Sequence, residues 1–377
     1  MIETPGVLWT ILSFFLMIGP LIFIHEMGHY LAGRAFGVKA DAFSIGFGRE
    51  LFGWTDKRGT RWKVGMLPLG GYVKFAGDMN PASTPSPEWL ALSPQERAQT
   101  FQAAKLWQKF LIVAAGPAVN FAFAIAVFAA VFSFYGEPRT PTVIGNIQVG
   151  SAADKAGIEV GDRILSIDGR EMPYWDDVVQ MVVIWPGKPL DIRIERDGRT
   201  MELIATPSVD IRQDRFGNTA RVGLLGVLPG RPVVEKLGPV EVLGASLRYT
   251  FNAVQLIIDT TGQIIMGERS VKELGGPLKI AQLSGQQASQ GWFPFILFMT
   301  MISINLGFIN LLPVPLLDGG HLLFYLIEGI RRRPLPPQAM EWAFRSGLAV
   351  LLTLMVFVTV NDLGSFGLWE RVAGLIG

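Results

Sequence analysis

The chain has 377 residues, of which 50% are hydrophobic and only 17% are charged, and its formal net charge is +1. A soluble chain would carry about a quarter charged residues, so the composition predicts a membrane protein, and the near-neutral charge gives no reason to expect nucleic acid as a partner. The chain contains no cysteine, which excludes disulfides, cysteine-ligated zinc, iron–sulfur clusters and thiol catalysis.

The first predicted element is a transmembrane helix within residues 1–36. No residue from Thr4 to Ile24 is charged, and a span needs about 20 mostly apolar residues. We expect a retained helix rather than a cleaved signal peptide, because no Lys or Arg precedes Arg34 and no small-residue cleavage pattern precedes the histidines.

Residues 37–79 have the pattern of β structure rather than helix. Glycines are frequent, and apolar residues alternate with other residues around Trp62, as expected for a strand with one buried face. Pro68 and the pair Gly70 and Gly71 predict a turn. We therefore expect a β region between the first two spans.

The second span is predicted at 110–136, which carries no charged residue. The loop before it, 80–109, begins with an exposed stretch rich in Pro and Ser. Residues 32–109 together carry eleven Lys and Arg against six Asp and Glu, and positively charged loops stay in the cytoplasm. The N-terminus and residues 137–290 are therefore expected on the outer side.

Residues 137–209 form a polar block with the pattern of a separate domain. It contains a short helix closed by Gly157, a strand at Arg163–Ile167, an Asp-Gly turn and a helix at about 175–184, followed by two alternating stretches. This order resembles a PDZ domain of the arrangement seen in bacterial proteases, and AGIEVGDRILSIDG carries most of the resemblance. A ligand peptide or the outer domain of a substrate is the partner expected for it.

An extracytoplasmic linker with an amphipathic helix is expected over 210–290. Within 238–266, apolar residues recur every three or four positions, so this helix should lie on the outer membrane surface or pack under the PDZ domain. The third span is predicted at 291–331, and the fourth, with a C-terminal tail, at 332–377. Arg331–Arg333 between them favours the cytoplasmic side, which returns the C-terminus to the outside.

Two of the three histidines, His25 and His29, lie four residues apart near the end of the first span. Positions i and i+4 share one helix face, so both imidazoles can hold one metal ion, and Glu26 can reach a water on that ion. Ionisable side chains at membrane depth are costly, about 2.5–3.5 kcal/mol for each Asp, Lys or Arg at the helix centre, and are therefore functional by default. The alternative is a polar cluster that reaches the membrane interface.

A catalytic zinc site usually has three protein ligands and a water, so a third ligand is expected at similar depth. Asp318 is the only acidic residue within 274–327. Pro313 and Pro315 predict a helix break just before it, and irregular backbone at membrane depth is tolerated where it lines a wet cavity. Asp318 is therefore the best candidate, and His321 remains a rival.

Three motifs, FIHEMGHYLAGR, GPAVNF and INLLPVPLLDGGH, occur in this order with a PDZ domain between the second and third spans. Together they resemble the site-2 protease family of intramembrane zinc metalloproteases, and most closely the bacterial regulator-of-sigma-E protease group. The resemblance implies one Zn²⁺ per chain, held by His25, His29 and Asp318, with Glu26 as the catalytic base. Some members carry two tandem PDZ domains, whereas this chain has room for one.

The same resemblance implies roles for residues around the site. Asn310 is expected to contact substrate, although a hydrogen bond between helices is an alternative. The β region with Gly70 and Gly71 corresponds to a membrane-associated hairpin, whose strand edge could bind an extended substrate or could simply lie in the interface. Gly116 and Asn120 are expected to pack against the helix that carries the histidines.

The fold class predicted is therefore a polytopic α-helical membrane protein with four transmembrane helices, a β hairpin region and one inserted extracytoplasmic PDZ domain. The expected function is hydrolysis of peptide bonds in or near transmembrane segments of single-span proteins in a bacterial inner membrane. Anti-sigma factors after a first outer cut, and signal-peptide remnants, are the substrates that the resemblance implies. A metal transporter and a non-catalytic PDZ adaptor stay open as alternatives, although no inverted repeat is visible and an adaptor has no use for Glu26.

Overall fold

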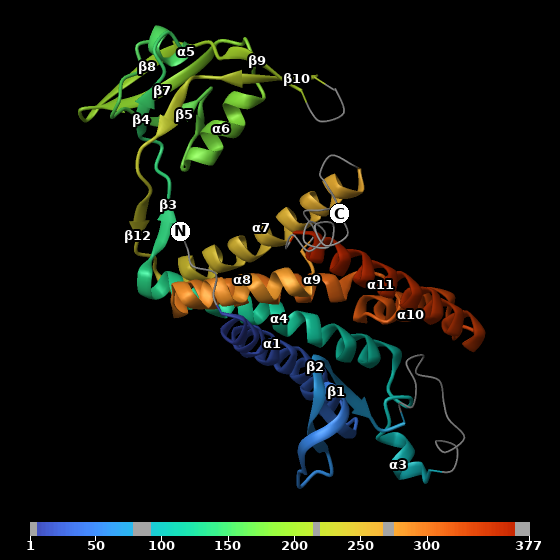
Figure 1. Ribbon diagram of the computed structural model, residues 1–377. Coiled ribbons are helices and arrows are strands. Elements are labelled where there is room, and N and C mark those ends of the chain that lie inside the picture. The colour runs from blue at the N-terminus through green and yellow to red at the C-terminus, as the bar shows by residue number, and fades with distance from the viewer. Residues whose placement is uncertain (1–5, 78–91, 214–218, 267–274, 366–377) are drawn as a thin grey trace, which may run out of the picture. The chain divides into compact units, whose positions relative to one another are not determined.

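The computed structural model describes residues 6–77, 92–213, 219–266 and 275–365 (Figure 1). The exposed stretch expected at the beginning of 80–109 and the C-terminal tail fall largely outside these residues. Internal contacts divide the chain into two units, one formed by residues 1–128, 247–262 and 270–377 and the other by 129–246 and 263–269. The first unit holds the apolar helices, and the second holds the inserted domain.

Four of the described helices are long and apolar enough to cross a membrane, one at each of the four predicted spans, which fits a polytopic membrane protein. They are α1 (Val7–Ala35), α4 (Leu106–Tyr135), α9 (Trp292–Leu311) and α11 (Pro337–Ser365). Much of their apolar surface faces outward: Leu16 of α1 and Val350 of α11 are 65% and 61% exposed. Lipid accepts such surfaces, and a helix satisfies its own backbone hydrogen bonds there.

The third predicted span does not continue as one helix. α9 ends at Leu311, and a shorter helix, α10 (Asp318–Arg331), begins after six intervening residues. The segment between them contains two prolines, which cannot donate a helical hydrogen bond, and Leu316 has a positive φ of 85°. The predicted break before Asp318 is therefore present, and it places that residue at the first turn of a new helix.

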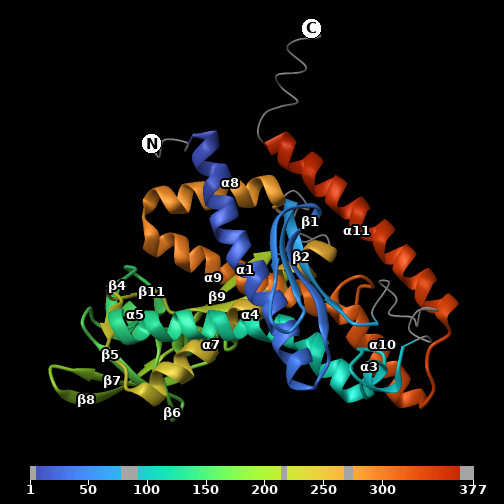
Figure 2. The ribbon, with the colours of Figure 1, turned by 90° about the horizontal axis from the view of Figure 1, so that it is seen from below.

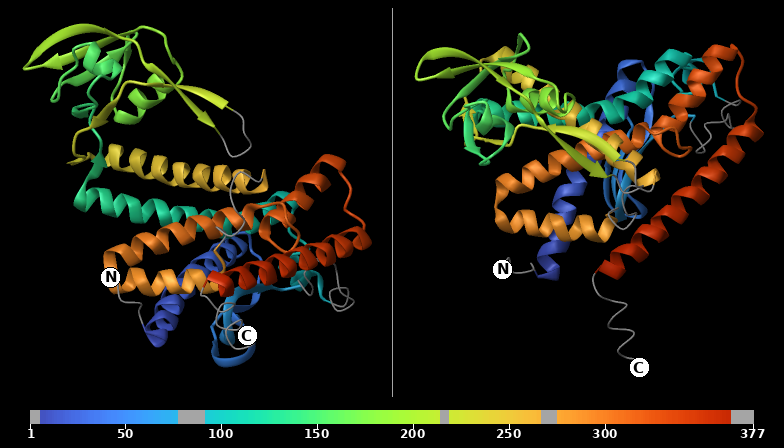
Figure 3. Two further views of the ribbon diagram at one scale, coloured as in Figure 1. Left: turned by 45° about the horizontal axis from the view of Figure 1, so that its top comes forward. Right: turned by 90° about the horizontal axis from the view of Figure 1, so that it is seen from above.

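Two further helices follow the inserted domain in the sequence, before α9. α7 (Pro239–Ile265) matches the predicted amphipathic helix, and α8 (Pro277–Gln290) packs along α1, where Ile280 and Ala288 contact the cluster around Met17. α8 and α9 form a helical hairpin at Gly291 (Figure 3), whose φ of 125° suits a residue without a side chain.

The β region consists of β1 (Ala40–Thr55) and β2 (Arg61–Phe75), which pair antiparallel with several register shifts and lie along α1 (Figure 2). Residues 42–45 of β1 pair with 71–74 on one side and with 61–64 on the other. β2 must therefore bend back between 64 and 71, although strand structure continues through it. The turn expected at Pro68–Gly71 is thus a bend inside a strand, and the loop that joins the two strands lies at 56–60.

Aromatic side chains hold this β region against the helices. Phe43 is 1% exposed and stacks on Trp62, and Tyr30 of α1 packs edge-on against both rings. Phe75 stacks on Phe101, which follows the short helix α3 (Pro94–Ala98). Aromatic pairs of this kind add about 0.5–1.5 kcal/mol each beyond their buried area, so β2 is fixed beside α1.

The inserted domain contains the predicted elements. A four-stranded sheet has the order β6-β5-β7-β8, and its apolar face packs with α6 around Ile164, Val178 and Ile192. The elements are β3 (Glu137–Arg139), β4 (Ile144–Ile147), α5 (Ala152–Lys155), β5 (Arg163–Ile167), β6 (Arg170–Glu171), α6 (Trp175–Val183), β7 (Leu190–Arg196) and β8 (Arg199–Ala205).

The predicted end of this domain at residue 209 is wrong, and so is the linker over the first part of 210–290. Four more strands follow: β9 (Ser208–Gln213), β10 (Thr219–Leu224), β11 (Val227–Pro229) and β12 (Val233–Glu235). β11 pairs with β4, β12 pairs with β3, and Leu225 is part of the domain core. β9 and β10 pair with each other, whereas β11 and β12 were missed because each has only three residues and finds its partner about 80–100 residues earlier in the chain.

Candidate metal centre

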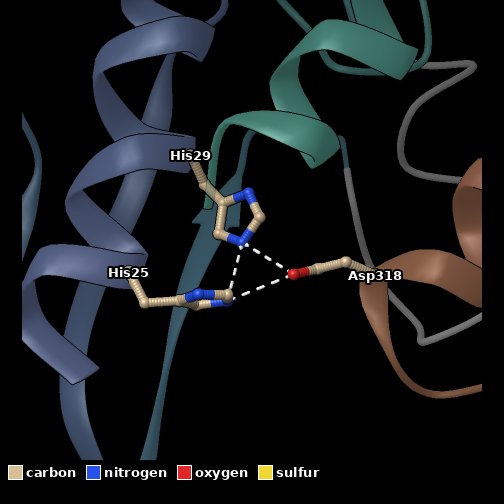
Figure 4. A group of neighbouring side chains, drawn as sticks. All are labelled: His25, His29 and Asp318. Carbon is tan, nitrogen blue, oxygen red and sulfur yellow. Dashed lines mark hydrogen bonds and ion pairs between the residues drawn. The ribbon is translucent and has the colours of Figure 1, made fainter. Parts of the chain in front are cut away.

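His25 and His29 face the same side of α1, as their spacing predicts, and both are buried. Their Nε2 atoms lie 3.3 Å apart. Oδ2 of Asp318 lies 3.1 Å from Nε2 of His25 and 3.4 Å from Nε2 of His29 (Figure 4). The structure thus brings the histidine pair of α1 together with a carboxylate that lies almost 300 residues later in the sequence.

The Asp-Gly-Gly sequence explains how α10 delivers the carboxylate. A Cβ on Gly319 would lie 2.3 Å from the carbonyl oxygens of Leu311 and Leu312, and one on Gly320 would lie 2.5 Å from that of Val314. Real Cβ atoms do not approach oxygen so closely. The first turn of α10 can therefore fold back against the end of α9 only because both residues lack a side chain.

The second ring nitrogen of His29 has a partner on α4. Nδ1 lies 2.9 Å from the carbonyl oxygen of Ile112, and a carbonyl only accepts, so Nδ1 carries the proton and Nε2 presents its lone pair toward Asp318. Gly116 makes room for the ring, because a Cβ there would lie 2.2 Å from Nε2 of His29. A Cβ on Gly28 would likewise lie 2.4 Å from the carbonyl oxygen of Ala115. α1 and α4 therefore cross at two glycines.

The three ligand atoms fit a zinc ion. Zinc takes nitrogen and oxygen ligands at about 2.0–2.1 Å in a tetrahedron, which separates neighbouring ligand atoms by about 3.3–3.4 Å. The three observed separations are 3.3, 3.1 and 3.4 Å. Oδ2 of Asp318 is also buried without a hydrogen-bond partner, as expected for an atom whose natural partner is a cation.

Glu26 lies beside this group and is 8% exposed. Its carboxylate accepts a hydrogen bond from the backbone N–H of Val73 in β2. A Cβ on Gly71 would lie 2.9 Å from Cγ of Glu26 and 2.8 Å from a methyl group of Ile22. β2 therefore packs directly on the glutamate, and Gly71 is the residue that permits this contact.

The other residues singled out in the sequence also gather here. Nδ2 of Asn310 lies 3.4 Å from Nε2 of His25, and Nδ2 of Asn120 lies 3.0 Å from Nδ1 of the same ring. Gly70 has a φ of 153° and packs against the ring of Phe47 rather than against the metal centre. An open pocket of about 540 Å³ is lined by most of the candidate residues, namely His25, Glu26, His29, Gly70, Gly71, Asn310 and Asp318.

His321 lines the same pocket but lies outside the group of converging ligand atoms. Its ring packs against those of Phe344 and Tyr325, with centroids 5.2 and 6.3 Å away. The geometry therefore favours Asp318 over His321 as the third ligand. The supporting groups on Ile112 and Val73 are backbone atoms, and the sequence carries no signal for them.

Comparison with known proteins gives an independent result. Residues 13–354 match the model of a family described as Peptidase family M50. A protein of Rhizobium meliloti that carries the provisional name of zinc metalloprotease is 44% identical over 360 residues, which cover 94% of this chain and 96% of that one. A protein of Agrobacterium fabrum with the same provisional name is 43% identical over the same shares. Metalloprotease MmpA of Caulobacter vibrioides is 35% identical over 98% of this chain and 99% of its own.

Proposed function

The chain belongs to peptidase family M50 and is a membrane-embedded zinc metalloprotease of the site-2 type, and from that premise we propose that it hydrolyses peptide bonds in or near transmembrane segments of single-span proteins. One observation carries the proposal. His25, His29 and Asp318 converge at ligand distances between helices that are apolar enough to lie in a membrane, with Glu26 beside them.

Each residue has a chemical task in the proposed reaction. His25, His29 and Asp318 hold the zinc ion, which, when bound, makes a water acidic enough to react near pH 7 and polarises a carbonyl oxygen. Glu26 takes a proton from the attacking water and passes it to the leaving amine. The N–H of Val73 holds the carboxylate of Glu26 in place, which keeps the base within reach of that water.

The substrate backbone is proposed to lie between β2 and Asn310. Residues 71–74 pair with 42–45 on one side, and no strand in the described part of the chain pairs with their other side. That free edge is the one from which the N–H of Val73 reaches Glu26. An unwound substrate segment added there as a strand would present its carbonyl groups near the metal, and the amide of Asn310 could hold its backbone.

We place the protein in the inner membrane of a bacterium, with both termini and the inserted domain outside and the metal centre near the cytoplasmic side. The excess of Lys and Arg in 32–109 and in Arg331–Arg333 supports this orientation. The resemblance to the regulator-of-sigma-E protease group supports anti-sigma factors, already trimmed outside, as substrates, together with signal-peptide remnants. The lipid bilayer is the further partner.

The inserted domain is proposed to act as a PDZ domain that binds a peptide or the outer part of a substrate. A groove of about 940 Å³ runs between α6 and the segment 223–228, and apolar side chains such as Val178, Val182 and Leu225 line it. Gly226 in that segment has a φ of 76°, which turns the chain into β11. A groove between a helix and a strand suits an extended peptide with apolar side chains.

Replacing Glu26 with Gln tests the proposed function. The full chain would be placed in membranes with a tagged single-span substrate, and both cleavage and zinc content would be measured. Cleavage should stop while zinc stays bound, because the ligands are untouched. Glu341→Gln changes an exposed glutamate of α11 and should leave both unchanged. Cleavage by the Glu26→Gln variant at the normal rate would overturn the role of the base.

A further inference from the structure

Asn120 is completely buried in α4 and contacts the ring of His25 on the side away from the metal centre. We propose that Asn120 is a positioning residue whose carboxamide oxygen accepts the Nδ1 proton of His25 and so keeps Nε2 of that ring free to bind the metal. This inference rests on the proposed function, since it concerns the zinc site. It assigns Asn120 a role beyond the packing expected for it.

The ring of His25 needs such an acceptor. Its Nε2 atom faces His29 and Asp318 at 3.3 and 3.1 Å, so Nε2 is the ligand atom and must carry a lone pair. A neutral imidazole then carries its proton on Nδ1, and ligating histidines almost always donate that proton to a fixed partner. The carboxamide of Asn120, 3.0 Å from Nδ1, is the group in the described structure that can take it.

The carboxamide oxygen of Asn120 in turn lacks a hydrogen-bond donor. Nδ2 of Asn120 faces the ring, while its Oδ1 is buried without any hydrogen-bond partner. Oxygen and nitrogen exchange places by a half-turn of the amide. With the oxygen toward His25, the ring proton gains an acceptor and the oxygen gains a donor. With the nitrogen toward the ring, Nε2 would carry the proton and could not bind a metal.

α4 supports the two histidines in the same way. The carbonyl of Ile112 accepts from Nδ1 of His29, and Asn120 lies eight residues, or about two turns, further along the helix on the same face. Gly116 lies midway and makes room for a ring. The position of Asn120 is itself fixed from α9, because the hydroxyl of Ser303 donates to its backbone carbonyl at 3.0 Å. One face of α4 thus fixes the orientation of the imidazole rings of both His25 and His29.

Zinc affinity of the purified full chain in detergent, measured by competition with a coloured chelator, tests this role. Asn120→Leu keeps the branched shape of the side chain but removes the acceptor, and should weaken zinc binding about 10–100-fold. Asn120→Asp offers an oxygen in either orientation and should bind zinc at least as tightly as the unchanged protein. Thr300→Val, which removes a buried hydroxyl that bonds only within α9, should leave the affinity unchanged. Asn120→Ala replaces the Leu variant if the latter does not fold.

The outcomes separate the two proposals. Weak binding by the Leu or Ala variant together with rescue by Asp supports the acceptor role. Equal affinity in all variants would overturn it, and so would a loss in Asn120→Asp as large as in Asn120→Leu, since packing or a donor role would then explain the residue. If the unchanged protein itself binds no zinc, the proposed function fails first, whatever Asn120 does.

Discussion

Gly116→Ala should disable the metal centre through a single methyl group. The added Cβ would lie 2.2 Å from Nε2 of His29, whereas carbon atoms approach other heavy atoms at about 3.5 Å. The difference is about 1.3 Å. The ring cannot swing aside without breaking the bond from its Nδ1 to the carbonyl of Ile112. Metal–ligand bonds tolerate deviations of only about 0.2 Å, so one ligand is effectively lost.

A displacement of about 1 Å commonly costs about 100-fold in catalysis, and a loss of zinc affinity of at least about 100-fold, or about 2.8 kcal/mol, is expected here. Equilibrium dialysis against buffered zinc measures it directly. Gly19→Ala is the matched control, because a Cβ at that position of α1 meets nothing within 4 Å. If Gly116→Ala keeps zinc affinity within about threefold of the control, the close helix crossing does not fix the ring.

Three further predictions follow from the same geometry. Loss of a residue that only supports a ligand weakens metal binding about 10–100-fold, and Asp318→Asn, which changes a proposed ligand, should weaken zinc binding by more than that. Full zinc affinity in equilibrium dialysis would exclude Asp318 as a ligand. Gly71→Ala pushes a Cβ to 2.9 Å from Cγ of Glu26, so cleavage of a tagged substrate should fall about tenfold with zinc content unchanged; loss of both would point to general misfolding. In the inserted domain, burial would raise the pKa of Asp162, but hydrogen bonds from Arg196 and the backbone outweigh it and hold the pKa below its usual value. The stability that Asp162 contributes should therefore be fully present above about pH 4, the pKa of the carboxyl in the unfolded state, and should be lost as the pH falls through the lower pKa of the folded state. Hydrogen exchange of the backbone amides in β5 and β7 measures this change in stability. In Asp162→Asn the pH dependence of the exchange should shrink, and an unchanged profile would contradict the assignment.

The convergence of His25, His29 and Asp318 could be predicted from the sequence because two independent constraints act on these residues. The helical period places His25 and His29 on one face, and the cost of ionisable groups in lipid leaves very few candidates for the third ligand. Asp318 met that constraint, and the prolines before it marked the break that frees it from the end of α9. These arguments need only residue spacing and composition, which the sequence gives directly, so they predict which side chains meet in the folded protein.

The surroundings of the site could not be predicted in the same way. The partners of His29 and Glu26 are the backbone carbonyl of Ile112 and the backbone N–H of Val73, and every residue carries such groups. The choice among them depends on where α4 and β2 cross α1. The packing of Gly71 against Glu26 likewise follows from the double pairing of β1, a long-range fact that a local turn signal at 68–71 does not contain.

The end of the inserted domain shows the same limit on a larger scale. The segment that contains Gly226 and Leu225 has the glycines of a linker, yet it completes the domain core and lines the groove. Pairing of β11 with β4 across about 80 residues decides this. Local propensity describes strands of three residues poorly, because their stability comes from the partner strand.

The separation of the ligands along the chain has a consequence for biosynthesis. α1 leaves the ribosome early, and its two histidines enter the bilayer long before Asp318 has been translated. Under the proposed ligand set, a nascent or truncated polypeptide would hold an incomplete coordination shell and would not hydrolyse its neighbours in the insertion machinery. Activity would then begin only when synthesis reaches Asp318, within the last 60 of the 377 residues, so the order of synthesis itself prevents premature cleavage.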